Sequence, residues 1–287
     1  IAIGNALTYS EGYESIHLIS GPLYHSGSLF LSFPCYIAAG KILIPMELQF
    51  KPFIKSIADE KCTGGWIAIS TWSDIMNAIK SGEVKLEDYD LSNFRYLLLG
   101  AQPVPYALLE ETKRIFPRLK VEFAHGTTEG GGGGTVNLYN EDILRKPGSI
   151  GRPTAFMDVK IVDDKGKEVP TGTVGELHLK GSRLMKEYAF NPEMTAKTIE
   201  NGWLHTGDLA FTDEEGYIYF TDRKKDLIIR GGENIYPAEI EDVLHRHPKI
   251  QDVAIIGYPH PRFVEIAMAI IQLKPSEAMT EEEVIEF

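Results

Sequence analysis

The chain has 287 residues, of which 43% are hydrophobic and 10% are aromatic, and its 29 basic and 41 acidic residues give a formal net charge of −12. This length and composition predict a soluble globular protein of two or three units. The acidic balance argues against a nucleic-acid-binding surface, which requires a basic face.

Neither a membrane span nor a disulfide framework is expected. The longest apolar run, at 29–39, is interrupted by Ser32 and Pro34 and is too short to cross a bilayer. The two cysteines, Cys35 and Cys62, lack the spacing of a metal site. Reduced thiols, and with them a cytoplasmic protein, are therefore favoured.

The first part of the chain alternates short apolar runs with amphipathic segments. Apolar runs that predict strands occur at 16–19, 42–44, 67–69, 96–99 and 121–123. The segments that predict helices are 53–60, 72–80 and 105–116, the last with Pro105 near its first turn. Such alternation predicts a parallel sheet covered by helices, in which ligands bind where the strands end.

After about residue 147 the pattern changes to short β segments, and later to a mixed α and β pattern. The expected β segments are 158–162, 175–179 and 217–220, and the last elements are strands at 228–229, 253–258 and 266–273 with a helix at 237–245. We therefore predict an α/β protein in three parts. They are an α/β subdomain at 1–146, a small β-barrel-like subdomain at 147–222 and a small mobile α+β domain at 223–287, with a hinge near the charged stretch 222–226.

Two kinds of polar pattern point to nucleotide chemistry. The run H-G-T-T-E at 125–129 supplies two hydroxyls and a carboxylate at a strand end, although taken alone it is typical of a polar turn. Further along, Asp208 and Arg223 stand among glycines and charges. A carboxylate can accept hydrogen bonds from both hydroxyls of a ribose, and a guanidinium can hold a sugar or phosphate oxygen.

Five motifs, in this order along the chain, resemble those of the acyl-adenylate-forming enzymes, the superfamily of acyl-CoA synthetases, beetle luciferases and peptide-synthetase adenylation domains. They are P-L-Y-H-S-G at 22–27, G-A-Q-P-V at 100–104, H-G-T-T-E at 125–129, G-E-L-H-L-K-G at 175–181, and the run from T-G-D-L to A-E-I-E at 206–241. The resemblance covers nearly all of this chain.

The resemblance implies roles for residues of the first three motifs. Thr128 is expected to contact the α-phosphate, Glu129 to help hold Mg²⁺, and His25 to border the carboxylate and the phosphate. His25 is expected to gate and position rather than to take a proton, because a carboxylic acid is already ionised at pH 7. The other nucleotide-binding residues implied here are Gly100, Ala101, Gln102, Ala124, His125, Gly126 and Thr127.

The later motifs imply the remaining contacts. Asp208 and Arg223 are expected to hold AMP, with Phe220 at the edge of the nucleotide. Lys225 matches the family's hinge position, where rotation exchanges the adenylating and thioester-forming faces. Gly231 and Gly232 match the path of the CoA pantetheine arm, although a Gly-Gly hairpin turn explains the local sequence nearly as well.

The chain departs from the family pattern at Ala124-His125, where the family usually has Gly-Tyr with the aromatic ring against adenine. The imidazole of His125 still offers a π-face, whereas the methyl group of Ala124 disfavours an aromatic substrate. Near His25 there is no Asp of the kind that holds an amino group in peptide-synthetase domains, which disfavours amino acids.

We therefore expect a carboxylic acid:CoA ligase that takes ATP and CoA as substrates, uses Mg²⁺, and acts on a fatty or other bulky apolar acid. The sequence leaves open transfer to a carrier protein, a luciferase-like oxidation, a nucleotide-binding scaffold module without catalysis, and a homodimer. The chain starts without Met, and the helix opened by the Thr280-x-x-Glu283 capping box is short at Phe287. We expect a fragment, itself not necessarily active, that lacks the family's phosphate loop and its C-terminal catalytic lysine.

Overall fold

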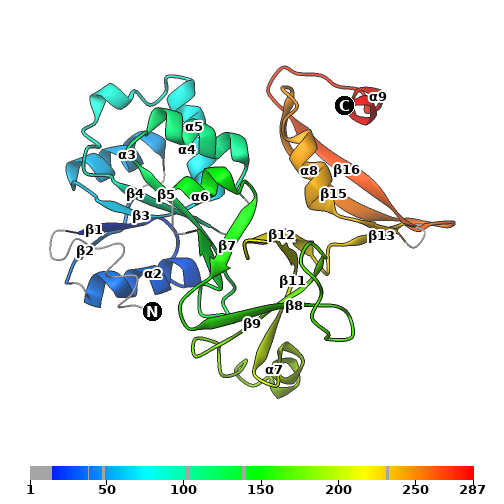
Figure 1. Ribbon diagram of the computed structural model, residues 1–287. Coiled ribbons are helices and arrows are strands. Elements are labelled where there is room, and N and C mark those ends of the chain that lie inside the picture. Colours follow the sequence, from blue (N-terminus) through cyan, green and yellow to red (C-terminus); the bar gives the residue numbers. More distant parts are fainter. Residues whose placement is uncertain (1–14, 38, 47–48, 101–103, 138–139, 231–232) are drawn as a thin grey trace. The chain divides into compact units, whose positions relative to one another are not determined.

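The structure, a computed structural model, describes residues 15–37, 39–46, 49–100, 104–137, 140–230 and 233–287 (Figure 1). The chain divides into two compact units. The first contains Ile1–Lys160, His178–His205 and Asp213–Tyr219, and the second contains Ile161–Leu177, Thr206–Thr212 and Phe220–Phe287. The three-part division expected from the sequence, with its hinge, stays a prediction.

A parallel sheet forms the centre of the first unit. Its strands, in spatial order, are β2 (Lys41–Leu43), β1 (Ile16–Ile19), β3 (Gly64–Ala68), β4 (Tyr96–Gly100) and β5 (Lys120–His125), and each pairs in parallel with the next. Two antiparallel strands, β6 (Thr135–Asn137) and β7 (Ser149–Pro153), continue it. Leu18, Leu97 and Val121 are fully buried in this sheet, as expected of strands that are covered on both faces.

Helices cover both faces of this sheet. Figure 1 shows α3 (Phe50–Asp59), α4 (Ile69–Lys80) and α5 (Tyr106–Ile115) over one face and α2 (Ser26–Ile37) over the other. Trp72 on α4 is 1% exposed, and its indole Nε1 donates a hydrogen bond of 2.8 Å to Thr112 Oγ1 on α5. A short 3-10 helix (Leu86–Asp88) and α6 (Asn140–Arg145) also belong to this unit.

Two sequence expectations about this unit need correction. The apolar run at 67–69 was predicted as a strand, but β3 ends at Ala68 and α4 begins at Ile69. Apolar residues continue from the end of the strand into the start of the helix, so the composition of this run does not show where one ends and the other begins. Helix α2 was not predicted, because its buried side chains include Ser28, Ser32 and Cys35 while several of its large apolar side chains are exposed. Its pattern is thus the reverse of an ordinary amphipathic helix.

The β segments expected after residue 147 are present. They are β8 (Met157–Val162), β9 (Gly175–Gly181), β10 (Ile199–Glu200), β11 (Trp203–Thr212) and β12 (Ile218–Arg223), with α7 (Pro192–Thr198) before β10. Within the first unit, β10 pairs antiparallel with the start of β11, and Ile218 and Tyr219 pair with β7. The division between the two units passes through β8, β9, β11 and β12.

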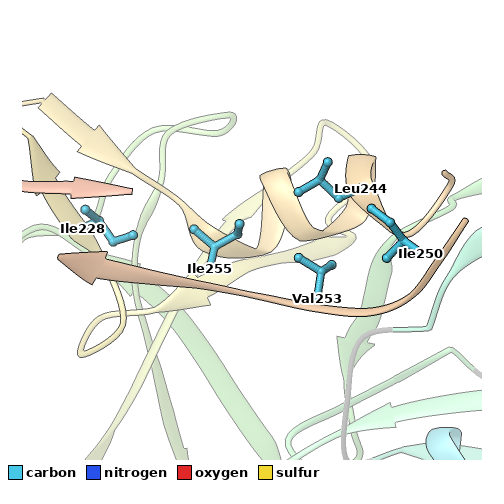
Figure 2. Close-up of a cluster of buried hydrophobic side chains, with 5 residues drawn as sticks. All are labelled: Ile228, Leu244, Ile250, Val253 and Ile255. Carbon is cyan, nitrogen blue, oxygen red and sulfur yellow. The ribbon is translucent and has the colours of Figure 1, made fainter. Parts of the chain in front are cut away.

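The C-terminal part of the second unit is a small antiparallel sheet with one helix packed on it. Its elements are β13 (Ile228–Arg230), β14 (Glu233–Ile235), α8 (Pro237–Leu244), β15 (Ile250–His260), β16 (Val264–Leu273) and α9 (Glu281–Glu286), and the strand order is β14-β13-β16-β15. Figure 2 shows the cluster of buried apolar side chains: Ile228, Leu244, Ile250, Val253 and Ile255. Burial of such aliphatic side chains is what holds α8 on β15.

The expected fold class is therefore confirmed: a parallel-rich, helix-covered sheet and a second, small antiparallel sheet with a helix. Within the described part of the chain, no helix has both the length and the apolar character that crossing a bilayer requires.

Candidate active site

The turn after β5 folds the motif H-G-T-T-E back on the glycine run that follows it. Gly130 N donates to Thr127 Oγ1 at 3.0 Å, and Gly134 N donates to His125 O at 2.9 Å. A side chain at Gly126 is excluded, because a Cβ there would lie 2.5 Å from the Cα of Gly133. The turn thus leaves the Thr127–Thr128–Glu129 backbone open at the carboxyl end of a central strand, where ligands of parallel sheets bind.

Thr128 meets the start of helix α2. Its hydroxyl donates a hydrogen bond of 3.2 Å to Ser26 Oγ, a contact between residues far apart in the sequence. Ser26 is the first residue of α2, so the first turn of the helix and the positive end of its dipole lie beside Thr128. This arrangement suits an anionic group such as a phosphate.

His25 is held on an aromatic platform that the sequence did not reveal. Its ring stacks on Trp66 of β3 with the centroids 5.6 Å apart and the planes 18° apart, and its Nδ1 accepts from Gly27 N at 3.1 Å. Trp66 is only 6% exposed and reaches Gly100, where an added Cβ would lie 3.2 Å from the indole Nε1. A tryptophan within a buried strand is an ordinary core residue by sequence pattern, so nothing in the sequence marked it.

Glu129 is oriented by Tyr188, another residue that sequence reasoning missed. The Tyr188 hydroxyl donates a hydrogen bond of 2.6 Å to Glu129 Oε1, and Met185 N donates to Glu129 O at 2.7 Å. Burial, together with the hydrogen bond to the Glu129 carboxylate, raises the pKa of Tyr188, so the phenol stays a donor at neutral pH. The Glu129 carboxylate and the hydroxyls of Thr128 and Ser26 are hard oxygen donors, and this donor set fits Mg²⁺.

Asp208 and Arg223 lie together in the second unit. Asp208, on β11, has 5% of its surface exposed, and its Oδ1 is 3.7 Å from Arg223 Nε at the end of β12. Its own N–H donates to Thr206 Oγ1 at 3.0 Å. The Arg223 side chain is 58% exposed, so its guanidinium can reach a ligand in solution while it stays near the buried carboxylate.

The residues that follow Arg223 are held differently from one another. Lys224 forms ion pairs with Asp164 at 3.0 Å and with Glu176 at 3.1 Å, and the hydrogen bond to Asp164 raises the pKa of Lys224. Lys225 is exposed and lines a hollow of about 470 Å³ within the second unit. The anchoring of Lys224 was not predicted, because both of its partners lie about fifty residues earlier in the chain.

The structure thus brings the predicted residues into two groups, one in each unit. The first group is His25, Gly100, Ala124, His125, Gly126, Thr127, Thr128 and Glu129, and the second is Asp208, Phe220, Arg223 and Lys225. Phe220 is half-buried on β12, in the same strand as Arg223. The predicted Ala101, Gln102, Gly231 and Gly232 lie outside the described residues. The role of each residue stays a prediction.

Comparison with known proteins gives matches along the whole chain. The model of the AMP-binding enzyme family matches residues 3–189, and the model of the AMP-binding enzyme C-terminal domain matches residues 239–287. A long-chain-fatty-acid–CoA ligase of Mycobacterium tuberculosis is 36% identical over 98% of this chain and 54% of its own length. A feruloyl-CoA synthase of an Amycolatopsis species is 34% identical over 88% of this chain and 50% of its own length.

Solved structures agree with these matches. The o-succinylbenzoate CoA synthetase of Bacillus subtilis in complex with AMP has a TM-score of 0.87 and 29% identity, covering 99% of this chain and 56% of that one. A Mycobacterium tuberculosis fatty acyl CoA synthetase has a TM-score of 0.74 at 34% identity, covering 99% of this chain and 55% of that one. The chain spans about half the length of the curated relatives it matches. Since the first family model alone covers more than half of its residues, the chain belongs to the AMP-binding enzyme family.

Proposed function

We propose that the complete protein is an AMP-forming carboxylic acid:CoA ligase. In the first half-reaction a carboxylate oxygen attacks the α-phosphorus of ATP and pyrophosphate leaves. In the second, the CoA sulfur attacks the acyl carbon, AMP leaves, and the thiol proton is released. The observation that carries this proposal is the buried Asp208 carboxylate 3.7 Å from Arg223, in a chain of the AMP-binding family. Such a pair suits the ribose and phosphate of a nucleotide.

The residues of the first unit have the chemistry that the first half-reaction needs. Thr128, beside the start of α2, would hold the α-phosphate, and the amide dipoles there would stabilise its negative charge. His25, stacked on Trp66, would border the acid and orient it. Holding both reactants in place accounts for a large part of catalysis in such a reaction, and no covalent enzyme nucleophile is required.

Glu129 would hold Mg²⁺, because a carboxylate oxygen is a ligand that this hard cation prefers. When bound, the ion neutralises charge that develops on the phosphates. The hydrogen bond from Tyr188 keeps one carboxylate oxygen of Glu129 in place, and so fixes the direction in which the other can approach a ligand.

For the acid, we propose a fatty or other bulky apolar chain. The relative named for long-chain fatty acids supports this class, as do the small residues of the glycine run at 130–134. The acceptor is proposed to be CoA, and a carrier-protein acceptor is the outcome to be tested against it. The cytoplasmic location, the reduced thiols and the homodimer stay predictions.

The proposal is tested with the complete protein and a panel of acids. Acid-dependent exchange of pyrophosphate into ATP reports the first half-reaction, and CoA-dependent release of AMP reports the second. We expect both for fatty or bulky apolar acids, and neither above background in Asp208→Ala. Asp242→Ala, which removes an exposed carboxylate from α8, is the matched control and should retain activity. Exchange without CoA-dependent AMP release would indicate another acceptor, and turnover of acetate or amino acids alone would contradict the acid class.

A further inference from the structure

Asp222 is a buried carboxylate to which the proposed reaction assigns no role. It lies on β12 directly before Arg223 and has 5% of its surface exposed. Both of its oxygens accept a hydrogen bond from the main chain. Oδ1 accepts from Arg223 N at 2.7 Å, and Oδ2 accepts from Ala238 N at 3.1 Å. One side chain therefore joins the end of β12 to a segment that lies sixteen positions later.

That segment is the first turn of α8. The helix starts at Pro237, which has no N–H, so Ala238 carries the first free N–H group of the helix. The residue before the helix, Tyr236, makes no side-chain cap. Asp222 takes the place of a capping residue from a distance, and its charge is stabilised by the positive end of the helix.

The same carboxylate also bears on the proposed nucleotide site. The main chain around Arg223 is held on two sides: Asp222 binds Arg223 N, and Lys224 N donates to Gly207 O at 2.8 Å, next to Asp208. The Arg223 guanidinium itself is exposed and 3.7 Å from Asp208, so its position depends on where its backbone is held.

We propose that Asp222 is a positioning residue. It holds the backbone of Arg223 and the first turn of α8 in one arrangement, so that the guanidinium stays beside Asp208 and meets a bound nucleotide. This inference rests on the proposed nucleotide-binding function of Asp208 and Arg223. The rival interpretation is that Asp222 only caps α8 and has no effect on the nucleotide.

The two hydrogen bonds are tested without reference to activity. Asp222→Ala removes both acceptor oxygens, whereas an Asn at this position would keep one oxygen that could still accept from Ala238 N. Hydrogen exchange of the Ala238 amide, followed in the complete protein, should become roughly 10-fold faster or more, since a hydrogen bond to a charged group is lost. The matched control is Glu239→Gln, which neutralises an exposed carboxylate in the same helical turn and should leave the exchange unchanged. Equal exchange in Asp222→Ala and the wild type would overturn the inference.

The positioning role is tested by AMP affinity in a double-mutant cycle. We expect Asp222→Ala to raise the Kd of AMP by about 10-fold, and to have no effect in an Arg223→Ala background, because Asp222 acts through Arg223. Faster exchange of Ala238 with an unchanged Kd of AMP would mean that Asp222 only caps α8, and would overturn the positioning role. An equal rise in the Kd in the wild-type and Arg223→Ala backgrounds would overturn it too. A wild type that binds no AMP would overturn the proposed nucleotide site itself, and the exchange result would still decide the Asp222 bonds.

Discussion

Replacement of Asp208 is the most direct test of the nucleotide site. The carboxylate is buried on β11 and faces the exposed Arg223. If it accepts hydrogen bonds from two ribose hydroxyls, Asp208→Ala removes both. The substitution leaves no unpaired buried cation, because the Arg223 side chain is 58% exposed and water can solvate it. The loss of AMP affinity should therefore report the lost hydrogen bonds rather than a stranded charge.

The expected size of the effect follows from these contacts. Hydrogen bonds to a charged acceptor contribute about 1.5–3 kcal/mol each, so two of them contribute about 3–6 kcal/mol. This corresponds to a rise of about 10²- to 10⁴-fold in the Kd of AMP for Asp208→Ala. Asp208→Asn keeps one acceptor oxygen but loses the charge, and its rise should be roughly 10- to 100-fold.

Isothermal titration calorimetry of the complete protein with AMP measures these constants. Asp242→Ala, on the exposed face of α8, is the control for loss of an acidic side chain. Thermal unfolding of each variant checks that a weaker interaction does not reflect a misfolded protein. A Kd for Asp208→Ala that equals the wild-type value, in a protein that remains folded, would refute the ribose-binding role.

Three further predictions concern other parts of the first unit. Burial lowers the pKa of His17 to about 4, so between pH 6.5 and 4 the unfolded chain binds more protons than the folded one. The free energy of unfolding should therefore fall by about 1.4 kcal/mol for each unit that the pH is lowered from 6.5 to 4. Urea unfolding at several pH values should show this slope, which His17→Asn should flatten; equal slopes would contradict it. Trp72→Ala should lower the free energy of unfolding by about 3–5 kcal/mol and leave Thr112 without its donor, whereas a loss under about 1 kcal/mol in urea unfolding would contradict the packing. Tyr188→Phe should raise the Mg²⁺ concentration for half-maximal pyrophosphate exchange by roughly 10-fold, because Glu129 loses its orienting donor; an unchanged Mg²⁺ dependence would rule out this orienting role.

The order of strands and helices could be predicted wherever local pattern and burial agree. Strands such as β1 and β4 are covered on both faces, so they appear as short apolar runs. The pattern failed at α2, whose sheet-facing side is lined by Ser28, Ser32 and Cys35. Side chains that small pack under a helix only in a particular tertiary setting, and no local rule describes it.

The candidate site divides in the same way. The order of the motifs and their resemblance to those of the acyl-adenylate-forming enzymes indicated Thr128, Glu129, Asp208 and Arg223, because each of these residues stands within a short run that can be recognised locally. Trp66 beneath His25, Tyr188 on Glu129 and the Asp222 bond to Ala238 join residues between 16 and 59 positions apart. Such contacts leave no local periodicity, since burial and hydrogen bonding between distant segments arise only when the chain folds. The sequence by itself therefore determined which groups could perform the chemistry, and only the tertiary structure decided which side chains hold them in place.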